Sequence, residues 1–181
     1  MGRSASRPLH RGWRSAALFA VIAMVPGEAA LRAQAPAAQS DIRFDPAAFF
    51  TGRTTSEGTL TQIFASDKAT RVSTFGTRQR SGEMVLDQQV QIGDQPVRNR
   101  TWRLRETAPG RFAGTISDAS TDLTGTLSGD TLTLTYTMDN NLGVHQVITV
   151  NAGGQSARNV MRIRRFGITV ARLTETIRRG D

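Results

Sequence analysis

The sequence predicts an all-β protein, an antiparallel up-and-down barrel of eight to ten strands with a short N-terminal helical plug. Short segments of alternating polar and apolar residues follow one another from Arg53 onward, separated by turn residues at intervals of about 8–12 residues. The links between them are too short for parallel crossovers, so neighbouring strands are expected to be antiparallel. Closing such a meander into a barrel removes its exposed edges, and a two-sheet sandwich is the alternative.

The N-terminus has the three parts of a secretory signal peptide. Arginines dominate residues 3–14, residues 15–25 are apolar, and small residues follow, with cleavage expected after Ala33 or Ala35. The apolar run is shorter than the roughly 20 residues of a membrane-spanning helix, which is the alternative interpretation. We therefore expect residues 1–33 to be a signal peptide, residues 34–43 a flexible tether and residues 44–181 the barrel of an exported protein, periplasmic or secreted.

Composition excludes several classes of protein. Hydrophobic residues make up 38% and charged residues 21% of the 181 residues, which is too apolar for a disordered chain. Half of the net charge of +8 lies in the first 33 residues, where five arginines face one acid. There is no cysteine, so a disulfide, a thiolate metal site and a cysteine-linked lipid anchor are excluded. Without an RNA-binding motif, we expect no nucleic-acid partner.

Each element follows from local residues. Asp45 followed by Pro46 predicts a helix start, and Gly52 ends that helix within two turns. Ten strands are then predicted, at residues 54–64, 70–79, 84–92, 97–106, 111–117, 122–128, 131–138, 144–151, 157–165 and 168–178. The clearest alternation is TLTLTYTM, where the apolar residues from Leu132 to Met138 share one face and threonines take the other. The pattern favours a water-soluble barrel over a transmembrane one, because polar side chains occupy the opposite face.

Two adjacent phenylalanines, Phe49 and Phe50, lie between the tether and the first strand. On a short helix they are expected to cover one end of the barrel as a plug. Gly52 would supply the sharp turn into the first strand. A recognition element is the alternative interpretation of the pair.

Several stretches resemble a bacterial family of unknown function with a calycin-like, or lipocalin-like, barrel. They are FFTGRT, MVLDQQV, RNRTWRL, RFAGTISD, LTGTLSGDTLTLTY and NVMRIRRFGITVARLTETIRR. The matching positions are Phe49, Phe50, Gly52, Arg100, Trp102, Phe112, Gly114, Thr115, Asp118, Gly125, Gly129, Phe166, Gly167 and Val170. The resemblance implies an exported envelope protein. Many members look like lipoproteins, but the lipidation cysteine is missing here, as is an acidic-Trp-Met-Tyr stretch before the penultimate strand.

The stretch VRNRTWRLRE carries the most suggestive constellation. Alternation places Arg98, Arg100, Trp102 and Leu104 on one face, which aims Arg100 toward the barrel mouth. There it would hold a carboxylate or phosphate head group, or, alternatively, stack on an aromatic ring and close the barrel. The candidate ligand-binding residues are Leu86, Gln88, Val90, Arg100, Trp102, Leu134 and Tyr136.

No credible catalytic constellation emerges from the sequence. His145 is the only histidine after residue 10 and is expected to be solvated, and GGQSAR is not a nucleophile elbow. Asp118 and Asp122 are expected to be loop acids, and we predict no metal site and no cofactor. We therefore expect the chain not to be an enzyme.

Three functions stay open at this point. The first is a protein that binds a small apolar or amphipathic, lipid-type ligand in the barrel. The second is a solidly packed envelope assembly protein that acts through its surface. The third is a cofactor-free isomerase with Tyr136, Gln88 and Glu57 as candidate groups. A C-terminal basic cluster is expected either to be solvated or to touch anionic envelope lipid, and consists of Arg162, Arg164, Arg165, Arg172, Arg178 and Arg179.

Overall fold

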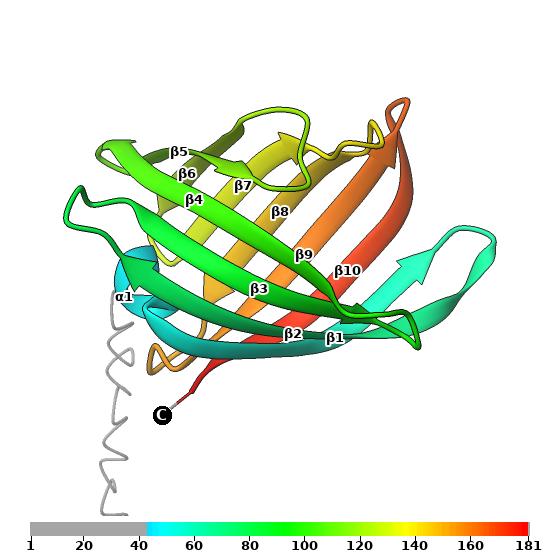
Figure 1. Cartoon of the computed structure of the whole chain (residues 1–181), viewed down its shortest axis with the longest axis horizontal. Coiled ribbons are helices and arrows are strands. Elements are labelled where there is room, and N and C mark those ends of the chain that lie inside the picture. The colour runs from blue at the N-terminus through cyan, green and yellow to red at the C-terminus, as the bar shows by residue number, and fades with distance from the viewer. Residues whose placement is uncertain (1–42, 181) are drawn as a thin grey trace, which may run out of the picture. The chain divides into compact units, whose positions relative to one another are not determined.

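Ten antiparallel strands close into one barrel, which confirms the predicted fold class (Figure 1). The structure is a computed structural model and describes residues 43–180. The predicted signal peptide, residues 1–33, and residues 34–42 of the tether lie outside the described residues. The elements are α1 (Pro46–Phe50), β1 (Gly52–Gln62), β2 (Ala65–Arg78), β3 (Met84–Ile92), β4 (Arg98–Ala108), β5 (Arg111–Ile116), β6 (Leu123–Ser128), β7 (Thr131–Thr137), β8 (Gly143–Val150), β9 (Ser156–Arg165) and β10 (Ile168–Arg179).

Each strand pairs with its neighbours in sequence, and β1 closes the barrel by pairing with β10. That last ladder runs from Thr54 opposite Arg179 to Gln62 opposite Ala171. Every strand therefore has two partners, which satisfies the backbone groups that an open sheet would leave at its edges. Among residues 43–180, no helix is long and apolar enough to span a membrane.

The strand boundaries follow the prediction closely, with one exception. β2 begins at Ala65, five residues before the predicted start at residue 70. Residues 65–69 were expected to connect two strands, but Gln62 pairs with Ala65 and Leu60 pairs with Lys68. Backbone pairing thus continues to a tight turn at the tip of the β1–β2 hairpin, which projects beyond the rest of the barrel (Figure 1). Pairing to β1 overrides the polar composition of this segment.

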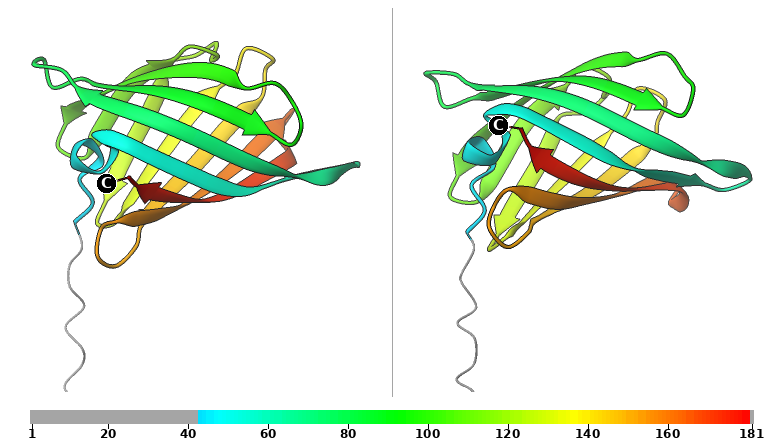
Figure 2. Two further views of the ribbon diagram at one scale, coloured as in Figure 1. Left: turned by 60° about the horizontal axis from the view of Figure 1, so that its bottom comes forward. Right: turned by 90° about the horizontal axis from the view of Figure 1, so that it is seen from below.

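The N-terminal helix covers one end of the barrel (Figure 2). Asp45 caps α1 by accepting a hydrogen bond from the Ala48 amide at 3.0 Å, a contact worth about 1 kcal/mol. The rings of Phe49 and Phe50 are buried and pack edge to face at 4.9 Å between their centroids. Gly52 turns the chain into β1 with φ +87°, a conformation that glycine adopts without strain.

The interior is asymmetric. Large buried side chains project from β3, β4 and β7, among them Leu86, Trp102 and Leu132. The inward residues of β1 and β2 are small by comparison, and those that are buried include Thr54, Ser56, Thr70 and Thr74. This difference in side-chain size leaves space inside the barrel.

Candidate ligand-binding site

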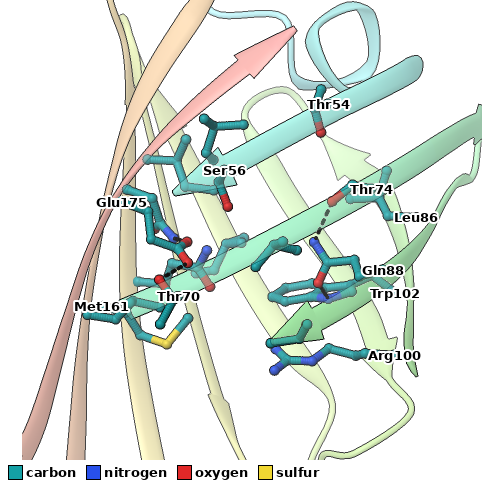
Figure 3. Close-up of a pocket in the computed structure, with 18 of the residues that line it drawn as sticks. Thr54, Ser56, Thr70, Thr74, Leu86, Gln88, Arg100, Trp102, Met161 and Glu175 are labelled. Carbon is teal, nitrogen blue, oxygen red and sulfur yellow. Dashed lines mark hydrogen bonds between the residues drawn. The ribbon is translucent and has the colours of Figure 1, made fainter. Parts of the chain in front are cut away.

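A cavity of about 150 Å³ lies inside the barrel, between the small side chains of β1 and β2 and the larger ones of the opposite wall (Figure 3). Its lining extends from Phe50 at the plugged end to Ile163 near the end of β9. A cavity of this size holds a molecule as large as benzene. The alternative prediction of a solidly packed interior is therefore wrong, because Thr54, Ser56 and Thr70 are too short to fill the space.

All seven predicted ligand-binding residues line this cavity. Their strands bring them together: Leu86 is the cross-strand partner of Trp102, and Gln88 is the partner of Arg100. The remaining members lie on β3 and β7, so the complete set is Leu86, Gln88, Val90, Arg100, Trp102, Leu134 and Tyr136. Their role in binding stays a prediction.

A short hydrogen-bond chain crosses this wall of the cavity. The indole Nε1 of Trp102 donates to Gln88 Oε1 at 2.7 Å, and Gln88 Nε2 donates to Thr74 Oγ1 at 3.1 Å. Tyr136 packs edge-on against Trp102, with 5.5 Å between the ring centroids. Because both ends of the Gln88 amide have protein partners, Gln88 orients Trp102 within the wall.

Arg100 contacts an aromatic ring, as the alternative interpretation of this residue expected. Its guanidinium carbon lies 5.8 Å from the centroid of the Trp102 ring, and its Nε lies 3.3 Å from Asp118 Oδ2. The arginine side chain is only 16% exposed, so this ion pair is shielded on one side. Arg98, which shares the face in sequence, is exposed and lies outside the cavity lining.

Burial raises the pKa of Tyr136 to about 12, and the nearby Arg100 charge lowers it in part. The tyrosine hydroxyl is buried and has no hydrogen bond to any residue from 43 to 180. Gln146 Oε1 and Asn159 Oδ1 are likewise buried without a partner in the described chain. All three side chains line the cavity. Buried polar atoms are usually paired, so these three mark where a guest molecule or water would be bound.

Glu175 is the functional candidate that sequence reasoning missed. It is 5% exposed, accepts hydrogen bonds from Thr70 Oγ1 at 3.1 Å and Asn159 Nδ2 at 3.0 Å, and lines the cavity. Burial raises the pKa of this carboxyl above its ordinary value, against the lowering effect of the two hydrogen bonds. Gly58 lies directly opposite, and a Cβ there would come within 2.6 Å of Glu175 Cγ.

A sequence signal for Glu175 did exist. It alternates with Ala171, Leu173 and Ile177, so it occupies an inward position of an otherwise apolar row. Glu57, which was predicted as a possible interior acid, is instead 70% exposed and faces Arg71 on the outer surface. That prediction is wrong because Glu57 alternates with the buried Ser56, which puts its side chain on the other face.

No other chemistry-bearing cluster appears in the described part of the chain. His145 pairs across strands with Arg162, whose side chain is exposed. Within residues 43–180 there is no group of three histidine or carboxylate side chains that could hold a metal ion.

A closed ten-stranded meander around an internal cavity defines a lipocalin-like barrel protein. Residues 27–179 match the family described as protein of unknown function (DUF3833), and the chain belongs to that family. This confirms the resemblance to a family of unknown function with a lipocalin-like barrel. Comparison with the curated proteins gave no match.

Two solved structures share the fold at low sequence identity. An S-type phycobiliprotein lyase, CPES from Guillardia theta, is 12% identical with a TM-score of 0.59, over 78% of this chain and 96% of that one. Rv2717c from M. tuberculosis is 14% identical with a TM-score of 0.58, over 76% of this chain and 99% of that one. At these identities the likeness concerns the fold alone.

The expectation that the chain is not an enzyme is overturned. A barrel of the same fold is, by its name, a lyase, so this architecture is compatible with an enzyme. The expectation rested on the lack of a recognisable motif in the sequence. Motif searches miss acids such as Glu175 that become neighbours of other polar groups only when distant strands close.

Proposed function

We propose that the barrel binds a small amphipathic, lipid-type molecule in its cavity. The observation that carries the proposal is that Tyr136, Gln146 and Asn159 each place a buried polar atom without a hydrogen-bond partner among residues 43–180 in a cavity whose walls are otherwise mostly apolar. Arg100 Nε, in the same lining, also lacks a hydrogen bond within these residues but lies 3.3 Å from Asp118 Oδ2. Leaving such atoms unpaired costs about 1–3 kcal/mol each, a cost that a bound polar group would remove.

The apolar part of the ligand would lie against Leu86, Trp102, Leu134 and Met161, which line the cavity. Each CH₂ group that it buries contributes about 0.8 kcal/mol. The narrow volume favours a thin chain or a single ring over a bulky molecule.

The polar part of the ligand is a hydrogen-bond donor in this proposal. The unpaired atoms of Gln146 and Asn159 are side-chain amide oxygens, which accept hydrogen bonds and cannot donate them. Arg100, expected from the sequence to hold an anionic head group, already faces Asp118 at 3.3 Å. With that charge compensated, the site suits a hydroxyl or amide better than a carboxylate.

The likeness to a phycobiliprotein lyase supports a barrel whose interior has a chemical function over a barrel that is only structural.

We also propose that the protein is exported, because residues 1–33 have the pattern of a signal peptide. Mass spectrometry of the protein recovered from cells would test this, since cleavage after Ala33 or Ala35 predicts a defined shortened N-terminus. Recovery of the intact chain from the cytoplasm would contradict export.

Extraction of the purified protein into organic solvent, followed by mass spectrometry, tests ligand binding. Leu134 lies in the cavity wall and is 3% exposed, so Leu134→Trp fills the space. Phe75→Trp is the matched control, because Phe75 is 53% exposed. We expect a small amphipathic molecule from the wild type and the control but not from Leu134→Trp. Equal recovery from all three, or recovery from none together with no uptake of added long-chain alcohols, would refute the proposal.

A further inference from the structure

The barrel end opposite α1 carries four exposed apolar side chains on two neighbouring hairpins. Ile63 and Phe64 form the β1–β2 turn and are 50% and 103% exposed, whereas Phe166 and Ile168 in the β9–β10 hairpin are 91% and 67% exposed. The hairpins are joined, since the Ile63 amide donates to the Val170 carbonyl oxygen at 3.0 Å. We call these four residues the apolar rim. Figure 2 shows both hairpin tips away from α1.

The backbone makes the two phenylalanines more unusual. Phe64 has φ 59° and Phe166 has φ 50°, both in the left-handed region. The third non-glycine residue with positive φ among residues 43–180 is Asn141, a residue type suited to that conformation. A bulky side chain there is unfavourable, and these two rings bury almost nothing in return. The fold gains nothing from either choice, which indicates an external role for the rings.

Positive charge is concentrated on the β9–β10 hairpin at this end of the barrel, whereas the β1–β2 hairpin carries Asp67 beside Lys68 and the β3–β4 link carries Asp94. From Val160 to Thr174 the chain contains four arginines and no acidic residue. Arg162 and Arg172 are direct cross-strand partners, an arrangement in which like charges repel. The guanidinium of Arg165 lies 5.6 Å from the Phe166 ring centroid. Arg162, Arg164, Arg165 and Arg172 are all exposed, and none forms an ion pair with another described residue.

We propose that this end docks onto the surface of a bilayer that contains anionic lipid. The apolar rim inserts at the boundary between head groups and acyl chains, and the four arginines contact the lipid phosphates. Charge complementarity favours this partner over others. The exposed aromatic rings match the apolar interior of the bilayer, and the arginines, which have no acidic partner among the described residues, match the anionic head groups that cover it. Docking is independent of ligand binding in the cavity, and each can fail without the other.

Vesicle sedimentation with the purified full chain tests the proposal. One set of vesicles contains phosphatidylcholine alone and the other an equimolar mixture with phosphatidylglycerol. The double variant Phe64→Asn/Phe166→Asn removes both rings and keeps a residue type that tolerates φ near +60°, so its melting temperature should not fall. Phe75→Asn, an exposed phenylalanine of β2 outside the rim, is the control. Residues 1–42 are the same in every variant, so their contribution cancels.

We expect binding to the anionic vesicles only, weakened about tenfold or more by the double phenylalanine variant. Arg164→Gln/Arg165→Gln should weaken binding by a similar factor, whereas Arg158→Gln, on the same strand toward the plugged end, should not. Equal binding to both vesicle types, or equal binding by the rim variants and their controls, would overturn the proposal. A rim that instead mediates self-association, detected as a dimer lost in the double phenylalanine variant, would also overturn it.

Discussion

Removal of the Phe50 ring tests whether α1 is a structural plug. Phe50 is 6% exposed, packs against the Phe49 ring and lines the plugged end of the cavity. Phe50→Ala removes a buried aromatic ring and leaves a cavity behind it. The short helix cannot move inward to fill that cavity, because Gly76 already lies against the Phe50 carbonyl group. Such truncations cost about 3–5 kcal/mol. For a domain of this size, that loss lowers the melting temperature by about 10–20 °C.

Thermal unfolding followed by circular dichroism measures the effect directly. Phe75→Ala is the matched control, because that ring is 53% exposed and its loss should change stability by no more than about 0.5 kcal/mol. A Phe50→Ala protein that melts with the wild type but no longer binds a ligand would refute the plug. The phenylalanine pair would then be a recognition element.

Three further changes probe the interior. Gly76→Ala should lower the melting temperature, because its Cβ would collide with the Phe50 carbonyl oxygen, whereas Gly143→Ala, with nothing closer than 4.0 Å, should not. Burial raises the pKa of Glu175 above 4.5, so this group stabilises the fold below that pH and the stabilisation is lost as pH rises through the raised pKa. In urea titrations, the unfolding free energy of the wild type should therefore fall as pH rises above 4.5, and Glu175→Gln should make this fall smaller. An equal fall in both proteins would contradict the raised pKa of Glu175. Tyr136→Phe removes a buried hydroxyl that has no hydrogen-bond partner among residues 43–180, so stability should stay the same or rise by about 1–3 kcal/mol while ligand affinity falls; a loss of stability above about 1 kcal/mol would contradict this.

Strand positions were readable from the sequence because alternation and turn residues are local signals. Leu132, Leu134 and Tyr136 face inward as their period of two requires. The cap at Asp45 and the turn at Gly52 were equally local. Where the prediction failed, at Ala65, the deciding contact was cross-strand pairing to β1.

The candidate site was predictable only in part. Leu86, Gln88 and Trp102 emerged because each lies on a clearly apolar strand face. Glu175 and Asn159 did not, because their importance depends on the closure of β10 against β1 and on its register with β9. The pairing of Arg100 with Asp118 joins β4 to a loop residue whose position no pattern in the sequence specifies.

Trp102 provides the most direct test of ligand binding in the cavity. It is the only tryptophan after residue 13 and lies in the cavity wall. We would titrate the purified protein with a long-chain alcohol, a thin molecule of the kind that the cavity suits, and record the emission of Trp102, with Trp102→Phe as the control. The account predicts a saturable change in tryptophan emission that the matching carboxylate produces only at higher concentration. Tryptophan emission that is unaffected by the alcohol, or a change that persists in Trp102→Phe, would contradict it.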